Sequence, residues 1–353
     1  MSDATTERRV REVVARATGR DTARVPVTRL AGHASLRSYW RVGAPPGSRV
    51  VMVLPPGAGS EEVTRGGPPA VNPFVDVRDF LAGLGARVPR IDRFEEDDPL
   101  GGLMVLEDLG DEMLETRLRA GDPPGPLYQR AVDVLARVRV AAERAQAGGA
   151  RSIALSRTFD FDLFLWELHH FREWLLEDWK KVTLSPAERG ELDRRFADIA
   201  RALDAEPKGF THRDYQSRNL MVLPGGEQVL IDFQDALLGP RQYDLVALLR
   251  DSYVDLSPDL VDAMVRRYLA RLEAEGGPRL EHDPFRRTFD LLTVQRKLKD
   301  AGRFVFIDRV KKNPGFLPNI PTSLRYVKAA LARLPELAPL QALLARHVPE
   351  LGD

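Results

Sequence analysis

The chain has 353 residues, and its 52 Lys and Arg residues balance its 52 Asp and Glu residues, so no global field attracts nucleic acid or an anionic membrane. It contains no cysteine, which excludes disulfides, zinc–thiolate sites and thiol nucleophiles. The N-terminal residues lack an apolar signal core, and no run of about 18 apolar residues occurs, so we expect a cytoplasmic protein without a membrane span.

The N-terminal third predicts mostly β-structure. Residues 5–18 have the apolar spacing of an amphipathic helix. Residues 72–84 begin with Asn and Pro, which is typical of a helix start. Four short runs have the composition of strands, and the first is long enough for a hairpin. These runs are residues 27–42, 49–54, 88–94 and 103–106.

The rest of the chain predicts mostly helices, apart from one central stretch. The last helical segment should form two helices, because Pro335 and Pro339 interrupt it. Strands followed by helices predict an α+β fold with a small β-rich lobe and a large helical lobe. The helical segments are residues 127–146, 159–180, 186–203, 243–253, 258–273, 285–303 and 322–346.

The central stretch, residues 211–243, carries the chemistry. Asp214 is followed five residues later by Asn219, and two apolar runs then flank a Gly-Gly turn before Asp232. Such runs around Gly-Gly predict a β-hairpin. If the turn is centred on the two glycines, Asn219 lies opposite Asp232 at the open end of that hairpin.

These residue types suit phosphoryl transfer. Carboxylate and amide oxygens are ligands that Mg²⁺ accepts, with water and phosphates completing its shell. Asp214 lies on the loop leading into the hairpin, where it can receive a hydroxyl proton. Protein kinases use this order of a catalytic Asp, a metal-binding Asn and a later metal-binding Asp. Each residue alone would be an ordinary turn cap, but all three at this spacing favour the catalytic interpretation.

The chain resembles the aminoglycoside phosphotransferase-like superfamily, whose members share the protein-kinase fold. The resemblance rests on residues 212–219, 231–235 and 239–245. Within that superfamily it is most similar to the anomeric N-acetylmuramate/N-acetylglucosamine kinases of cell-wall sugar recycling, through residues 106–110 and 295–304. The resemblance implies a bilobal fold and an ATP-dependent kinase, with Mg²⁺, that phosphorylates the C1 hydroxyl of these amino sugars.

The resemblance also assigns roles within the central stretch. It makes Asp214 the catalytic base, and Asn219 and Asp232 the magnesium ligands. His212 would brace the catalytic loop. Asp244, at the start of a predicted helix, is expected to be structural, since an acidic residue stabilises a helix N-terminus.

Domain limits follow from the change from strand to helical patterns near residues 107–110. Residues 1–108 are expected to form the nucleotide-binding lobe, and residues 109–353 the helical lobe with the catalytic loop and the sugar pocket. Glu107 and Leu109 would lie at the hinge and offer backbone groups to the adenine, although an ordinary strand-to-helix connection is the alternative. Asp235 would contact the substrate or a second metal, or would cap its own loop.

Two departures from kinases of this fold concern phosphate binding. The strand at residues 49–54 carries Met52 and Val53 where a Lys is usual, and no G-x-G-x-x-G loop is present. The first hairpin offers Ser35 and Arg37 instead, whose backbone N–H and positive charge could contact phosphates. Arg41 could supply the charge in place of Arg37, and a solvated strand residue is the alternative for both arginines.

The substrate residues are predicted from charge. Arg296, Lys299 and Arg303 fall on one face of a predicted helix, and we expect them to contact the carboxylate of N-acetylmuramate. A solvated helix face is the alternative. This cationic face suits an anionic or neutral sugar better than a polycationic aminoglycoside.

Three functions therefore stay open. They are a sugar 1-kinase, another small-molecule kinase such as an aminoglycoside or amino-alcohol phosphotransferase, and a nucleotide-binding pseudokinase. The expected partners are ATP and a small amino sugar, with neither nucleic acid nor membrane, and the protein is expected to be a monomer.

Overall fold

The computed structural model describes residues 3–30, 37–54, 71–98 and 101–352. The chain forms two compact units, and neither is continuous in sequence. The β-rich unit comprises Met1–Ala70, Arg87–Glu112 and Met221–Ile231. The helical unit comprises Val71–Ala86, Met113–Leu220 and Asp232–Asp353. The helix after Asn72 therefore groups with the helical unit, although it precedes residue 108, and the central hairpin groups with the β-rich unit, although it follows residue 108. A single boundary after residue 108 stays a prediction.

A five-stranded antiparallel sheet in the order β1-β2-β3-β5-β4 forms the centre of the β-rich unit. The predicted strands are confirmed, although β4 begins at Ile91 rather than at residue 88. Pro89 explains the later start, because proline has no N–H to donate to a ladder. The strands are β1 Val27–Arg29, β2 Ser38–Val42, β3 Arg49–Leu54, β4 Ile91–Asp98 and β5 Gly101–Glu107.

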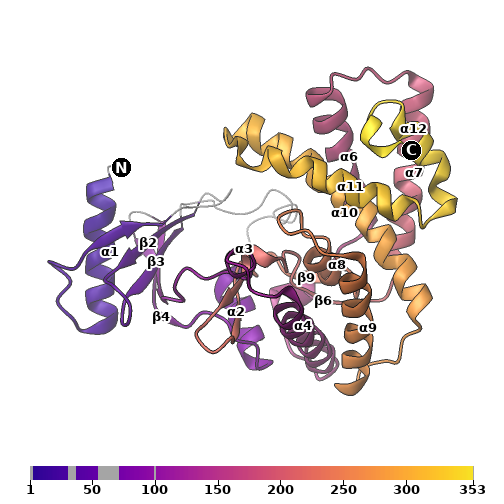
Figure 1. Ribbon diagram of the computed structural model, residues 1–353. Coiled ribbons are helices and arrows are strands. Elements are labelled where there is room, and N and C mark those ends of the chain that lie inside the picture. Colours follow the sequence, from indigo (N-terminus) through magenta and orange to yellow (C-terminus); the bar gives the residue numbers. More distant parts are fainter. Residues whose placement is uncertain (1–2, 31–36, 55–70, 99–100, 353) are drawn as a thin grey trace. The chain divides into compact units, whose positions relative to one another are not determined.

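Helix α1 (Asp3–Thr18) covers one face of this sheet (Figure 1). Val10, Val13 and Val14 recur at helical spacing and are buried against the sheet residues. Their partners include Trp40 and Val51. The amphipathic pattern of residues 5–18 therefore encodes both the helix and the face that it buries.

The predicted central hairpin is present as β7 (Leu220–Val222) and β8 (Gln228–Leu230). Gly225 and Gly226 both have positive φ, of 89° and 86°, which only glycine adopts without strain. The Leu223 N–H donates to the Glu227 carbonyl at 2.8 Å and closes the turn. The Gly-Gly signal in the sequence therefore predicted this turn for the correct reason.

The helical unit also holds a two-stranded antiparallel sheet, β6 (Lys208–Thr211) with β9 (Leu237–Pro240). Its other elements are helices with 3₁₀ turns between them. The helices are α2 Pro73–Gly83, α3 Leu114–Arg119, α4 Pro124–Ala147, α5 Ile153–Ser156, α6 Phe161–His170, α7 Pro186–Asp204, α8 Tyr243–Leu249, α9 Pro258–Ala274, α10 His282–Lys311, α11 Ile320–Leu331 and α12 Ala338–Ala345.

Three helical predictions need correction. The segment 159–180 was expected to be one α-helix, but α6 continues into a π-helix, η2 (Phe171–Trp179), with a wider turn. Helix α10 runs on to Lys311 instead of ending at Arg303, because its residues from Phe304 to Ile307 are buried. Helix α8 ends at Leu249, earlier than predicted. Two helices after residue 320 are confirmed, with a 3₁₀ turn at Pro335 between them.

Helix α10 is a long, largely buried helix of this unit. Its residues between Phe285 and Ile307 are buried on nearly every side, and it packs against α6, η2, α8 and α11. Figure 1 shows α11 running beside it. Because the buried stretch includes Arg and Lys residues, their charges must be met by partners inside the protein.

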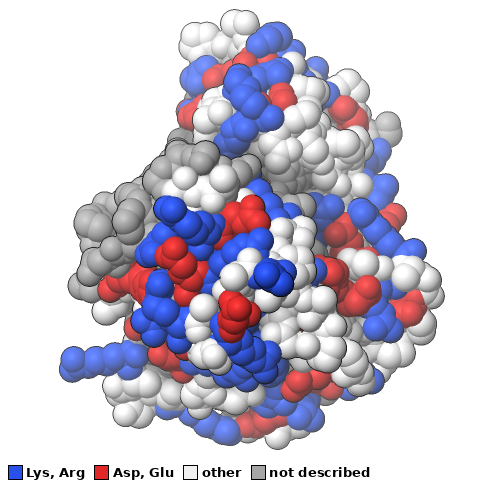
Figure 2. Space-filling model, turned by 90° about the vertical axis from the view of Figure 1, so that its left-hand side faces the viewer, with Lys and Arg blue, Asp and Glu red and all other residues white. Residues whose placement is uncertain are grey.

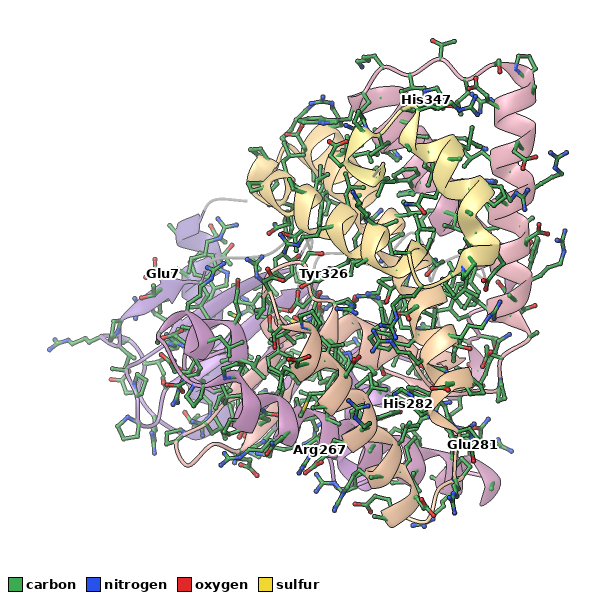
Figure 3. All side chains as sticks on the ribbon, turned by 45° about the vertical axis from the view of Figure 1, so that its right-hand side comes forward. Glu7, Arg267, Glu281, His282, Tyr326 and His347 are labelled. Carbon is green, nitrogen blue, oxygen red and sulfur yellow. The ribbon has the colours of Figure 1, made fainter. Side chains whose placement is uncertain are left out.

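Pairs of helices in this unit are joined by ion pairs. Helices α4 and α9 lie side by side (Figure 1), and Arg267 of α9 binds Asp133 of α4 with two hydrogen bonds of 2.7 and 2.6 Å. Arg267 is labelled in Figure 3, as is Tyr326 of α11, whose hydroxyl donates to the Val254 carbonyl at 3.1 Å. Side-chain bonds of this kind tie together segments that are distant in sequence.

The face in Figure 2 carries intermingled basic and acidic residues rather than a patch of one sign. This pattern fits the zero formal net charge of the chain. In the described part of the chain, no helix combines the length and the apolar character needed to cross a bilayer.

Candidate active site

The loop after β6 is held by one buried carboxylate. Asp244, in the first turn of α8, accepts the N–H of His212 at 2.7 Å and the N–H of Arg213 at 2.9 Å. Arg213 has a φ of 78°, a conformation that costs energy for a residue with a side chain. Burial raises the pKa of Asp244, whereas the two N–H groups oppose that rise. Asp244 thus fixes the backbone directly before Asp214.

Asp214 and Asn219 lie together, as the sequence predicted. The Asn219 Nδ2 donates to the Asp214 backbone carbonyl at 2.8 Å. The Asp214 side chain is 33% exposed, and its Oδ1 accepts a bond from Arg296 Nη2 at 3.3 Å. A partly exposed carboxylate with one oxygen held can still meet a substrate hydroxyl.

The turn between these two residues has a buried anchor that the sequence reasoning missed. Asp251 accepts the Ser217 N–H at 2.8 Å and the Ser217 hydroxyl at 2.5 Å. Asp251 is 1% exposed, and burial raises its pKa while Ser217 opposes that rise. The available signal was a carboxylate two residues after the apolar run of α8. Asp251 therefore fixes the 3₁₀ turn that ends at Asn219.

Asp232 follows β8 with a φ of 61°, again in the left-handed region. Gln234 Nε2 donates to Asp232 Oδ1 at 2.9 Å and to Asp235 Oδ2 at 3.4 Å. The ring of Phe233 is buried and packs against Phe74 of α2, with 4.8 Å between ring centroids. The two residues that follow Asp232 thus anchor it, and Asp235 shares its loop.

The donor set fits a magnesium ion. Asn219 directly precedes β7 and Asp232 follows β8, so both lie at the open end of one hairpin. The Nδ2 bond to Asp214 identifies which end of the Asn219 amide carries the oxygen. No group of three His, Cys, Asp or Glu residues in the described chain could hold a metal. A metal here would have few protein ligands, which Mg²⁺ tolerates when phosphates and water supply the rest.

The three predicted substrate residues lie on α10. The alternative of a solvated helix face is wrong for Arg296 and Lys299, which are 2% and 9% exposed, whereas Arg303 is half-buried. Lys299 lies 3.3 Å from Asp300 and 3.9 Å from Glu167, and Arg303 Nη1 lies 3.4 Å from His170 Nε2. Arg296 faces the catalytic loop rather than solvent. A substrate role for these residues stays a prediction.

The predicted nucleotide contacts lie in the β-rich unit. The Glu107 N–H donates to the Arg90 carbonyl at 3.0 Å, so it is engaged within the sheet. Arg37 precedes β2 and is half-buried, whereas Ser35 lies outside the described residues. Leu109 lies between Asp108 and the positive-φ Gly110. These four roles stay predictions.

Arg41 organises the segment that follows β5. It binds Asp108 with bonds of 2.7 and 3.0 Å and Asp111 with bonds of 2.9 and 2.8 Å. Burial of Asp108 would raise the pKa of that carboxyl, but hydrogen bonds from Arg41 and Ser48 lower it overall. Arg41 therefore fixes this segment and is no solvated strand residue.

Comparison with known proteins agrees with the family resemblance of the sequence. Residues 26–282 match the model of the phosphotransferase enzyme family. The N-acetylmuramate/N-acetylglucosamine kinase of Pseudomonas aeruginosa is 34% identical over 88% of this chain and 86% of its own length. The kinase of the same name from Neisseria meningitidis serogroup B is 32% identical over 91% of this chain and 90% of its own length.

Solved structures share the fold at lower identity. The GDP and kanamycin complex of APH(2")-IIia has a TM-score of 0.59 and 15% identity, covering 94% of this chain and 98% of its own. Choline kinase LicA from Streptococcus pneumoniae has a TM-score of 0.58 and 15% identity, covering 93% and 99%. These likenesses confirm the predicted α+β, protein-kinase-like fold.

Proposed function

The chain belongs to the phosphotransferase enzyme family, and from this premise we propose that it phosphorylates the C1 hydroxyl of N-acetylmuramate, N-acetylglucosamine or both, with ATP as donor. One observation carries the proposal. The set of Asp214, Asn219 and Asp232 lies in a chain that is 30–34% identical, over about nine tenths of its length, to four kinases named for these two sugars. As a phosphotransferase, the protein acts on a hydroxyl group.

Asp214 would act as the base in this reaction. The acceptor oxygen forms a bond to the γ-phosphorus, the bond to the β–γ bridging oxygen breaks, and ADP leaves. The hydroxyl proton passes to the Asp214 carboxylate and from there to solvent. An anomeric hydroxyl is more acidic than an ordinary alcohol, so a carboxylate suffices as base, and positioning supplies much of the rate.

Asn219 and Asp232 would hold the magnesium ion. When bound, that ion neutralises charge on the phosphates. The protein contributes the fixed direction of its two ligands, because Asp214 orients the Asn219 amide and Gln234 orients the Asp232 carboxylate. Asp235, which also accepts a bond from Gln234, would then lie beside the metal ligands and near the substrate.

The β-rich unit would bind the nucleotide without the usual lysine. Met52 is fully buried and Val53 nearly so, so a charged residue at either position would lie in the apolar core. We propose Glu107 and Leu109 as contacts of the base, and Ser35 and Arg37 as contacts of the phosphates. Replacing Arg37 by Met should raise the KM for ATP and leave the KM for the sugar unchanged.

The protein is also proposed to act as a cytoplasmic monomer. An enzyme that uses ATP needs the compartment that holds ATP. The exposed large apolar residues in the described chain are Val71, Trp179 and Val310, and so few suggest no extended apolar patch. Light scattering after size exclusion tests the monomer, and cell fractionation tests the location.

The experiment measures ADP release with ATP and magnesium across N-acetylmuramate, N-acetylglucosamine, glucose and kanamycin. Phosphorus NMR identifies the product, and chelation of magnesium serves as the control. An anomeric phosphate on an N-acetyl sugar supports the proposal. Turnover on kanamycin alone would overturn it in favour of an aminoglycoside kinase. Nucleotide binding without ADP release on any acceptor would favour the pseudokinase.

A further inference from the structure

The backbone before the proposed base is held from two sides. The Arg213 N–H is bound by Asp244, and the Arg213 carbonyl accepts a bond from Arg296 Nη1 at 2.9 Å. Arg213 has a φ of 78°, which an isolated loop would not maintain. Arg296 thus supplies one of the contacts that keep this strained residue in place.

Arg296 is itself fixed within α10. It is 2% exposed, and its Nη1 also donates to the hydroxyl of Tyr243 at 2.7 Å. Its guanidinium lies over the Tyr243 ring, 5.0 Å from the centroid. A planar guanidinium held at these points has little freedom to move, so it can fix what its second nitrogen binds.

That second nitrogen binds the proposed base. Arg296 Nη2 lies 3.3 Å from Asp214 Oδ1. Among the described residues, no other side chain forms a hydrogen bond or an ion pair with this carboxylate. One carboxylate oxygen is therefore held by the protein, and Oδ2 is left to meet an acceptor hydroxyl.

We propose that Arg296 is a positioning residue for catalysis, which holds the peptide of Arg213 and the Oδ1 of Asp214 so that Oδ2 faces the acceptor. This inference rests on the proposed function, because it needs Asp214 to be the base. It replaces the substrate contact predicted for Arg296, since a side chain buried to this degree acts through Asp214 and not on the acceptor.

The test compares Arg296→Met and Arg296→Lys with Arg286→Met. Arg286 is a matched control, because it is a buried arginine on the same helix, 5% exposed, that binds Asp262 and Asp290 away from the catalytic loop. Arg296→Met should lower kcat by roughly 100-fold with the KM of the sugar changed less than about threefold, as expected when only orientation is lost. Arg296→Lys should recover part of kcat, and Arg286→Met should keep kcat within about threefold.

A double variant separates positioning from general damage. In an Asp214→Asn background, Arg296→Met should cause no further loss of the residual activity, because the two residues act as one unit. An additive loss would overturn the inference, as would a raised KM with unchanged kcat, or an equal loss of kcat in Arg286→Met.

Two provisions keep the result interpretable. If Arg296→Met does not fold, Tyr243→Phe is measured instead, because it removes only the hydroxyl that Arg296 binds. In Tyr243→Phe, kcat should fall several-fold with KM constant, and an unchanged kcat would contradict the inference.

Ratios between variants are measured on whichever acceptor the wild type uses, or on ATP hydrolysis by water. Failure of the N-acetyl sugars as substrates of the wild type is thereby distinct from failure of Arg296 as a positioning residue.

Discussion

At the scale of the residue, the catalytic loop depends on a few buried polar side chains with defined partners. Asp244 binds the successive N–H groups of His212 and Arg213, and Arg296 binds the carbonyl of Arg213. Asp251 binds both the N–H and the hydroxyl of Ser217. A buried acceptor that loses its donor pays a large desolvation cost. Substitutions in this set should therefore affect stability and turnover together, whereas Asp214 itself should affect turnover alone.

Asp214→Asn tests the base. The amide keeps the size of the side chain, and Asp214 is partly exposed, so we expect an unchanged unfolding midpoint. Turnover should fall by several orders of magnitude, because the amide cannot accept the hydroxyl proton. Single-turnover phosphoryl transfer and circular dichroism measure the two effects. Turnover like that of the wild type would remove Asp214 from its proposed role.

Asp244→Asn tests the anchor of the loop. An amide has one acceptor oxygen, so one of the N–H groups of His212 and Arg213 would face a donor. We expect a loss of about 1–3 kcal/mol in the free energy of unfolding, together with a lower kcat. Asp259→Asn, at an exposed position in the first turn of α9, is the control and should change stability by less than about 0.5 kcal/mol. Equal effects of both substitutions would contradict the anchoring role.

At the scale of the element, α10 is the helix on which several other elements of the helical unit pack. It packs against α6, η2, α8 and α11, and it carries Arg296 to the catalytic loop. Gly302 lets the backbone of α10 approach the point where α6 becomes the π-helix, since a Cβ there would lie 2.7 Å from the Phe171 Cα and would also clash with the His170 carbonyl. The close contact with His170 and Phe171, rather than a special dihedral angle, therefore requires glycine at position 302.

Gly302→Ala should destabilise the protein by roughly 1–3 kcal/mol, because backbone atoms cannot easily give way to the added methyl group. Gly190→Ala is the matched control within α7, since a Cβ there would meet no atom within 4 Å. It should stabilise by about 0.5–1 kcal/mol through the lower backbone entropy of the unfolded chain. Urea unfolding measures both variants, and the prediction fails if their effects have the same sign.

At the scale of the whole molecule, the chain passes between two compact units more than once. The helix after Asn72 groups with the helical unit, and residues 221–231 group with the β-rich unit. Within the β-rich unit an ion pair joins α1 to the sheet, where Arg16 binds Glu95 with bonds of 2.9 and 2.7 Å. The response of this unit to acid should therefore depend on such carboxylates.

The hydrogen bonds from Arg16 lower the pKa of Glu95 from 4.5 to about 2. A carboxyl whose pKa is lower in the folded state stabilises the protein above its unfolded pKa, and this contribution is lost as the pH falls from 4.5 toward 2. Glu95→Gln should thus cost about 0.5 kcal/mol at pH 7, a small figure because the pair is partly exposed, and nothing near pH 2. Chemical unfolding at several pH values measures the difference. Glu96→Gln, at an exposed neighbouring position, should show no such dependence on pH.

The elements of the fold could be predicted, and the central candidate set could be proposed, because their signals are local. The Gly-Gly turn, the Asn72 cap and the valines of α1 each specify structure through neighbours within a few residues. The spacing from Asp214 to Asn219 and the hairpin before Asp232 belong to the same class. One short stretch of chain thus contains the predicted base and both predicted metal ligands.

The tertiary structure decided what the charged residues of α10 do. Arg296 reaches Asp214 across 82 residues of sequence, and helical periodicity alone placed it on a solvated or substrate-binding face. Its burial, like that of Asp244 and Asp251, depends on which helices surround it, and no local pattern encodes that. The sequence by itself therefore determined the local elements and the candidate groups for phosphoryl transfer, because their signals lie within one short stretch, whereas packing between distant segments decided which side chains hold that stretch in position.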